Sequence, residues 1–186
     1  MGFAKRFLVI ALLFPTTLAH PLVAISAAET ILVDVEKGIV DGINLLAGIE
    51  AIRPLVGEGN VSTEEWPVDG GPITVYVLKI KGHQIYAHYN ESWVDVTIKD
   101  PVFRTREGLK AGSKVKEFNK AYQNKPRITE VLGETISYIL EPNRTIVGIQ
   151  LDVSKIPLDQ LLSMKEDDPA LGEIAVRELG LRYIVH

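Results

Sequence analysis

Apolar and polar residues alternate along several segments of the chain, a pattern typical of β-strands with one buried face. The three clearest stripes of apolar residues are Val94, Val96 and Ile98; Ile136, Tyr138 and Leu140; and Val147, Ile149, Leu151 and Val153. Residues 73–80 are apolar in both phases, which favours a strand inside a sheet. A turn at residues 141–143 separates the last two stripes, so 135–140 and 145–153 are predicted to pair as a hairpin.

Three other segments have apolar residues at helical spacing. The first contains Leu45, Ile49 and Ile52, and the second contains Val115, Phe118 and Tyr122. The third is predicted over residues 169–179. Asp167 or Asp168 would cap it, Pro169 suits its first turn, and Gly180 would close it before a short strand at 181–185.

The first two helices follow similar glycine pairs. Gly38-Ile39-x-x-Gly42 precedes the first, and Gly108-Leu109-x-x-Gly112 precedes the second, 70 residues further along. A run of strands follows each helix, so we predict an internal duplication. The predicted fold is α+β: an antiparallel sheet of about six strands with helices on one face, built from two tandem α-β-β units. The first repeat covers about 36–100, the second about 106–153, and a C-terminal helix and strand occupy 157–186.

The N-terminus has the layout of a secretory signal peptide. Lys5 and Arg6 precede a short apolar run, and small residues follow, ending at Ala28. Cleavage after Ala28 fits this pattern best, and cleavage after Ala19 is the alternative. A permanent membrane anchor is disfavoured because polar residues and prolines interrupt the apolar run after Phe14. The predicted location is therefore the periplasm or the exterior of the cell.

Removal of residues 1–28 leaves about 158 residues, the usual size of a single domain. The chain has no cysteine, which excludes disulfides, thiolate nucleophiles and a lipid-bearing cysteine. Its formal net charge is −4, and acidic residues dilute the densest basic stretch, 104–125. Nucleic acid is therefore not an expected partner, and no membrane anchor is expected after cleavage.

Residues from about 36 to 152 resemble a family of uncharacterised enterobacterial envelope proteins described as RpoE-regulated lipoproteins. The resemblance rests on Gly38, on the 94–100 strand with its terminal Asp100, and on Gly108-Leu109-Lys110-x-Gly112-Ser113 before a helix with Phe118. It implies an envelope location and an α+β fold, and the family offers no activity to carry over. The lipid-bearing cysteine of that family is missing here.

No group of residues specifies a reaction, so no catalytic residue, metal or cofactor is predicted. His83 and His88 lie five residues apart on one strand and should point to opposite faces, which disfavours a shared metal ion. Glu64 and Glu65 beside Trp66 are the best acid–base candidates, but glycosidases place their two carboxyl groups on separate elements across a cleft.

Aromatic residues supply the candidate binding surface: Trp93, Trp66 and Tyr86. Trp93 shares a strand face with Asp95 and Thr97, the predicted solvent face, where an exposed tryptophan could anchor a partner. The leading hypothesis is a non-enzymatic exported protein that binds another envelope protein or a small ligand. The alternatives are a hydrolase of envelope polymers that uses Glu64 or Glu65, and a secreted enzyme inhibitor.

Overall fold

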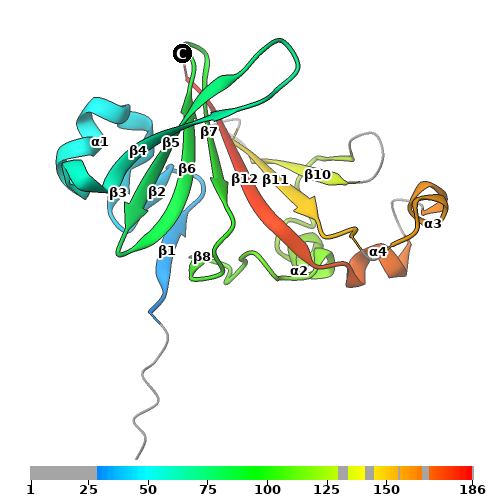
Figure 1. Ribbon diagram of the computed structural model, residues 1–186. Helices are drawn as coiled ribbons and strands as arrows, with labels where there is room; N and C mark the ends of the chain where they lie inside the picture. Colours follow the sequence, from blue (N-terminus) through cyan, green and yellow to red (C-terminus); the bar gives the residue numbers. More distant parts are fainter. Residues whose placement is uncertain (1–28, 130–133, 141–144, 155, 165–167, 186) are drawn as a thin grey trace, which may run out of the picture.

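The computed structural model describes residues 29–129, 134–140, 145–154, 156–164 and 168–185. The predicted signal peptide and the turn at 141–143 lie outside these residues. The described chain forms two β-sheets with short helices against them (Figure 1). The α+β class is therefore confirmed, but the sheets have eight and four strands, so the prediction of one sheet of about six strands is wrong.

The large sheet is antiparallel throughout and has the strand order β4-β5-β6-β7-β12-β11-β10-β9. Its strands are β4 (Val61–Trp66), β5 (Ile73–Ile80), β6 (His83–Tyr89), β7 (Trp93–Ile98), β9 (Arg127–Thr129), β10 (Thr135–Leu140), β11 (Thr145–Leu151) and β12 (Val176–Ile184). The predicted hairpin is confirmed, because β10 and β11 pair along their whole length.

The small sheet has the order β3-β2-β1-β8. Its strands are β1 (Ile31–Asp34), β2 (Ile39–Val40), β3 (Ile43–Asn44) and β8 (Phe103–Thr105). β1 and β8 run parallel, with Ile31 opposite Phe103, and both of these side chains are buried. This pairing joins the start of the described chain to its middle.

The helical elements are the 3-10 turns η1 (Leu45–Ala47) and η2 (Glu58–Asn60) and the helices α1 (Ile49–Val56), α2 (Val115–Ala121), α3 (Leu158–Ser163) and α4 (Pro169–Glu173). Three of the helices, α1, α2 and α4, pack with the small sheet against the buried face of the large sheet, whereas α3 lies at the edge of the molecule (Figure 1). Ile52 of α1 and Phe118 of α2 are fully buried in the same core as Val96 of β7. The helical spacing around these two residues was therefore interpreted correctly.

Alternation along the strands produces the core. Val94, Val96 and Ile98 are buried while the intervening residues of β7 are half-exposed, as the sequence predicts. The same rule holds for β11, whereas in β10 Ser137 is buried in addition to Ile136, Tyr138 and Leu140. Because every second residue faces the helices, the remaining residues of the large sheet form a second, helix-free face.

The C-terminal prediction is wrong in one respect. The helix that Asp168 caps, through a 2.8 Å hydrogen bond from the Ala170 amide, ends at Glu173 instead of 179. The chain then becomes β12, and Gly180 lies in the middle of this strand instead of closing a helix. β12 is extended because β7 and β11 pair with it on both sides, and this tertiary pairing outweighs the local helix signals.

Candidate functional site

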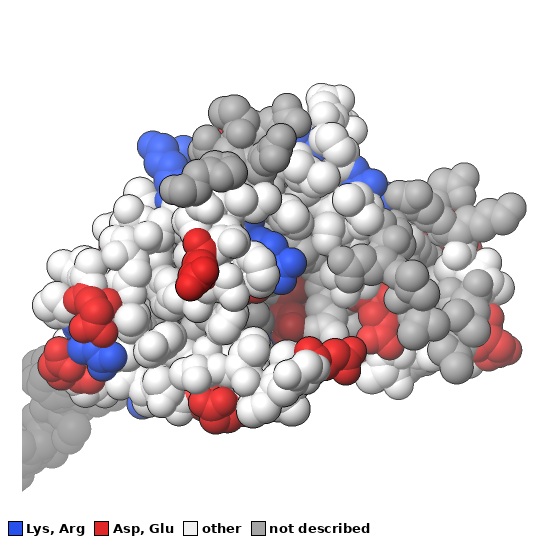
Figure 2. All heavy atoms as spheres, turned by 90° about the horizontal axis from the view of Figure 1, so that it is seen from above, with Lys and Arg blue, Asp and Glu red and all other residues white. Residues whose placement is uncertain are grey.

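The helix-free face of the large sheet carries a groove that crosses the strands from β4 to β9. Its cavity volume is about 370 Å³. Seen from above, the molecule is hollowed near its centre, with acidic atoms in the hollow and both basic and acidic residues at its edge (Figure 2). The side chains and glycines that line the groove include Trp66, Ile73, Val75, Tyr86, His88, Asp95, Thr97, Ile128, Ser137, Ile139, Ile146, Gly148, Gly180 and Arg182.

Small residues from four adjacent strands form the floor of the groove. Thr97 of β7 is opposite Gly180 of β12, which is opposite Gly148 of β11, which is opposite Ser137 of β10. Ile128 of β9 continues this row at the edge of the sheet. The floor is low because no residue in the four-strand row is larger than threonine.

Neither the backbone conformation nor the contacts of an added Cβ atom require glycine at positions 148 and 180. Gly148 and Gly180 are not among the residues with positive φ. A Cβ atom added at Gly148 would lie 3.7 Å from Ser137 Oγ, and one added at Gly180 would lie 3.6 Å from the Gly148 carbonyl oxygen, which are ordinary contacts. Glycine inside a strand weakens the strand and often marks a place where a ligand or another backbone approaches closely.

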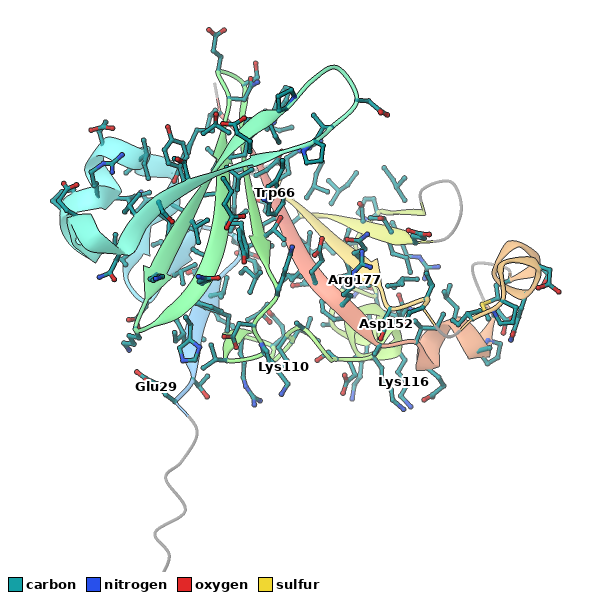
Figure 3. All side chains as sticks on the ribbon, in the orientation of Figure 1. Glu29, Trp66, Lys110, Lys116, Asp152 and Arg177 are labelled. Carbon is teal, nitrogen blue, oxygen red and sulfur yellow. The ribbon has the colours of Figure 1, made fainter. Side chains whose placement is uncertain are left out.

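An aromatic wall closes the groove at the β4–β6 end. The ring centroids of Trp66 and Tyr86 are 5.3 Å apart. Lys99 Nζ lies 4.8 Å from the Trp66 centroid and 5.0 Å from the Tyr86 centroid, so one cation contacts both rings. Trp66 also donates a 3.1 Å hydrogen bond from Nε1 to Glu64. Figure 3 shows Trp66 between the β4–β5 hairpin and strands β12 and β11.

The opposite wall is aliphatic. Ile139 of β10 and Ile146 of β11 are opposite each other in the hairpin, and both line the groove. Ile128 stands at the end of this wall on the edge strand β9 and is 52% exposed, one of the few large exposed hydrophobic residues in the described chain. An isoleucine this exposed stabilises the free protein little, because burial is what makes an apolar side chain stabilising.

The charged residues around the floor are paired with one another. Arg182 donates two hydrogen bonds to Asp95, of 2.7 and 3.0 Å, from the strand next to it. Lys99 lies 3.7 Å from Glu178. Such half-exposed pairs add little stability, but they cancel the charge of the site. The groove is thus polar in places without a net charge to attract an ion.

His88 has a fixed proton on one nitrogen. Its Nδ1 is 2.9 Å from the Thr74 carbonyl oxygen, and a carbonyl can only accept, so Nδ1 must carry the hydrogen. The neutral ring then offers Nε2 as an acceptor. His83, on the same strand, contacts Asp100 instead, with Nδ1 2.7 Å from Oδ2, so the two histidines do not converge.

Asp100 accepts a hydrogen bond from the Val102 amide in the turn that follows β7. Burial favours its neutral form, but the Val102 amide and His83 hydrogen-bond to the carboxylate and hold the pKa of Asp100 below its ordinary value. These two hydrogen bonds tie the Asp100 carboxylate to the turn that follows β7 and to the first residue of β6. Within the described residues, no group of three or more His, Cys, Asp or Glu side chains is placed to hold a metal ion.

The three aromatic residues predicted for binding are only partly gathered. Trp66 and Tyr86 form the aromatic wall. Trp93 lies on the same face of the sheet, half-buried, but its ring packs 5.5 Å from the Arg182 guanidinium carbon and does not line the groove. It therefore orients a residue of the groove instead of contacting a ligand there.

The predicted acid–base pair is separated by the strand itself. Glu64 bonds to Trp66 on the groove face, whereas Glu65 accepts a 2.8 Å hydrogen bond from Thr74 Oγ1 on the other face. The two carboxyl groups thus do not meet across a cleft.

Sequence reasoning missed the floor glycines. Gly148 lies between the buried residues Val147 and Ile149 of an alternating strand, at a position that faces away from the core. Gly180 lies between Leu179 and Leu181 at the corresponding kind of position. A glycine at the solvent-facing phase of a strand is the signal that could have identified both residues.

Comparison of the chain with protein-family models, with curated proteins and with solved structures finds no match. None of the helices in the described part of the chain has the length and apolar character to cross a membrane.

The contact of Lys99 with both rings predicts a measurable role in stability. Lys99→Ala should lower the free energy of unfolding by about 0.5–1 kcal/mol, the range for a cation–π contact at an exposed site. Urea unfolding followed by tryptophan fluorescence measures this change. Lys79→Ala is the control, because Lys79 is exposed on the neighbouring strand β5 and should change stability by less than about 0.5 kcal/mol. Equal changes in the free energy of unfolding for the two substitutions would contradict a stabilising contact of Lys99 with the rings of the aromatic wall.

Proposed function

We propose that this protein is a non-enzymatic binding module that holds a ligand in the groove across its eight-stranded sheet. The observation that carries this proposal is the pair of floor glycines, Gly148 and Gly180. They cost strand stability, and neither backbone conformation nor packing requires them. What they provide is space, between an aromatic wall and an aliphatic wall.

The alternative of a hydrolase has weaker support from the site. The titratable groups beside the floor are engaged with each other or with the backbone: Asp95 with Arg182, and His88 with the Thr74 carbonyl. Glu64 and Glu65, the suggested catalytic pair, point to opposite faces of β4. A groove with apolar walls and neutralised charges is suited to binding.

Fragment screening by NMR tests the binding function. Small fragments added to ¹⁵N-labelled protein should shift the backbone amide signals of Thr97, Gly148 and Gly180. Gly148→Val should weaken these fragments at least tenfold, because its methyl groups would occupy the floor. The substitution should leave the free energy of unfolding unchanged or raise it by up to about 1 kcal/mol, since a β-branched residue replaces a strand glycine.

The matched control is Gly59→Ala. Gly59 lies in η2, its φ is not positive, and an added Cβ meets nothing within 4 Å. Fragment binding should stay within twofold of the original protein. Fragments that shift amides evenly over the surface, or that bind Gly148→Val equally well, would refute the binding function.

We further propose that the protein is exported and acts in the cell envelope or outside the cell. Support comes from the two cations and the apolar run near the N-terminus, followed by small residues up to Ala28. In this proposal the partner is another envelope protein or a small ligand. Fractionation and N-terminal sequencing of the expressed protein should find a chain that starts at Glu29, or at His20 for the alternative site. Recovery of intact Met1 in the membrane fraction would contradict export.

We also propose that the fold arose by duplication, but of a larger unit than the α-β-β unit predicted over about 36–100 and 106–153: a strand, a helix and four strands, so that the last strand belongs to the second repeat. Strands β4 to β7 follow α1, strands β9 to β12 follow α2, and their orders mirror each other about the β7–β12 contact. Gly38 and Gly108 both have positive φ, of 65° and 81°, as do their partners Gly42 and Gly112. An experimental structure tests this: residues 31–98 and 103–184 should superpose with equivalent strand order, and matching α1 to α2 without matching strands would refute it.

A further inference from the structure

We propose that the ligand of the groove is an extended, uncharged segment of another polypeptide, with two apolar anchor side chains four residues apart. This inference rests on the binding function proposed above and specifies the ligand.

The floor is suited to the approach of a peptide backbone. Gly148 and Gly180 leave a strip without side chains, and glycine permits close approach of a second backbone. Beside this strip lies Ser137, which is only 8% exposed and still lines the groove. A hydroxyl group that lines the groove can donate a hydrogen bond to a carbonyl group, or accept one from an amide group, of a bound main chain.

The spacing of the walls gives the length of the segment. The floor spans β7, β12, β11 and β10, and neighbouring strands are about 4.8 Å apart, so the floor is about 14 Å long. An extended chain advances about 3.3 Å per residue, so residues i and i+4 are separated by about 13 Å. One anchor would then contact Trp66 and Tyr86, and the other would contact the isoleucine wall.

The charges of the groove favour an uncharged segment. Asp95 and Arg182 form a two-bond pair, and Lys99 is near Glu178. A charged side chain placed over the floor would lose its hydration without gaining a free partner charge in the described groove. Residue i+2, whose side chain would face the floor as those of i and i+4 do, should therefore be small and uncharged.

The aliphatic wall distinguishes a peptide from a saccharide. An aromatic ring beside polar groups would suit either ligand, but Ile128, Ile139 and Ile146 offer no hydrogen bonds to sugar hydroxyls. A saccharide would leave its hydroxyl groups unpaired there, which is costly. An apolar side chain gains from the same contact, because it buries surface against the exposed Ile128.

A phage-displayed library of random heptapeptides is the probe for this inference. Panning against the immobilised protein should enrich peptides with apolar or aromatic residues at positions i and i+4 and a small uncharged residue at position i+2. The enriched peptides are then synthesised with a fluorescent label, and their dissociation constants are measured by fluorescence anisotropy.

Two groove variants and one control decide the result. Gly148→Val should weaken peptide binding at least tenfold by filling the floor. Ile128→Asp should do the same by placing a charge on the aliphatic wall, and its exposed position makes unfolding of this variant unexpected. Gly59→Ala, outside the groove, should bind within twofold of the original protein.

Other outcomes overturn the inference. Enrichment of peptides with a charged residue at position i+2, absence of enrichment, or binding by Gly148→Val or Ile128→Asp that is as tight as binding by the original protein would each refute a peptide ligand in the groove. A glycan array and the fluorescent fatty acid parinaric acid are tested in parallel. If either binds the groove while peptides do not, the peptide is the wrong ligand although the binding function stands. If fragments also fail to bind in the groove, the binding function itself fails.

Discussion

The register of β12 is the constraint on which both the core and the groove depend. β12 lies between β7 and β11 and joins the two halves of the large sheet. Its Leu179, Leu181 and Tyr183 are buried, and burial of each leucine contributes roughly 1.5–3 kcal/mol. A slip of one residue would expose all three and would bring Gly180 and Arg182 into the core. The same burial that stabilises the core therefore fixes the floor glycine in the groove.

The two faces of the large sheet follow different physical rules. On the helix-covered face, large apolar side chains such as Tyr138, Phe118 and Ile98 fill the space between sheet and helices. On the groove face, small residues and paired charges leave space open, and this arrangement costs stability in comparison with a strand of β-branched residues. Proteins depart from local preferences of this kind mainly at functional sites. The contrast between the faces is therefore a stronger indication of function than any single side chain in the groove.

Aromatic and charged residues contact one another around the groove. Lys99 contacts both rings of the aromatic wall and also approaches Glu178, so one side chain links β4, β6 and β12. Trp93 packs against Arg182, which is itself held by Asp95. Such contacts hold the walls of the groove in place, and under the proposed binding function a preorganised site would lose less conformational entropy on binding.

Much of the local structure was determined by the sequence alone. Alternation predicted β7, β10 and β11 with the correct buried faces, and helical spacing predicted α1 and α2, because these patterns need only neighbouring residues. Two of the three aromatic residues predicted for binding, Trp66 and Tyr86, line the groove. The number of strands was underestimated because β2, β3, β8 and β9 have only two or three residues each, too few to show a period, and because β4 is mostly exposed and has no apolar stripe.

Only the tertiary structure decided which strands are neighbours, and the site follows from that decision. Thr97 lies beside Gly180 although the two are far apart in the sequence, and no periodicity within either strand encodes their pairing. The region after Glu173 carried helix signals, yet it is a strand because β7 and β11 supply hydrogen-bond partners on both sides. A side chain's face is set by its own strand, whereas a groove needs several strands in register. The sequence therefore determined the faces, and long-range pairing determined the groove.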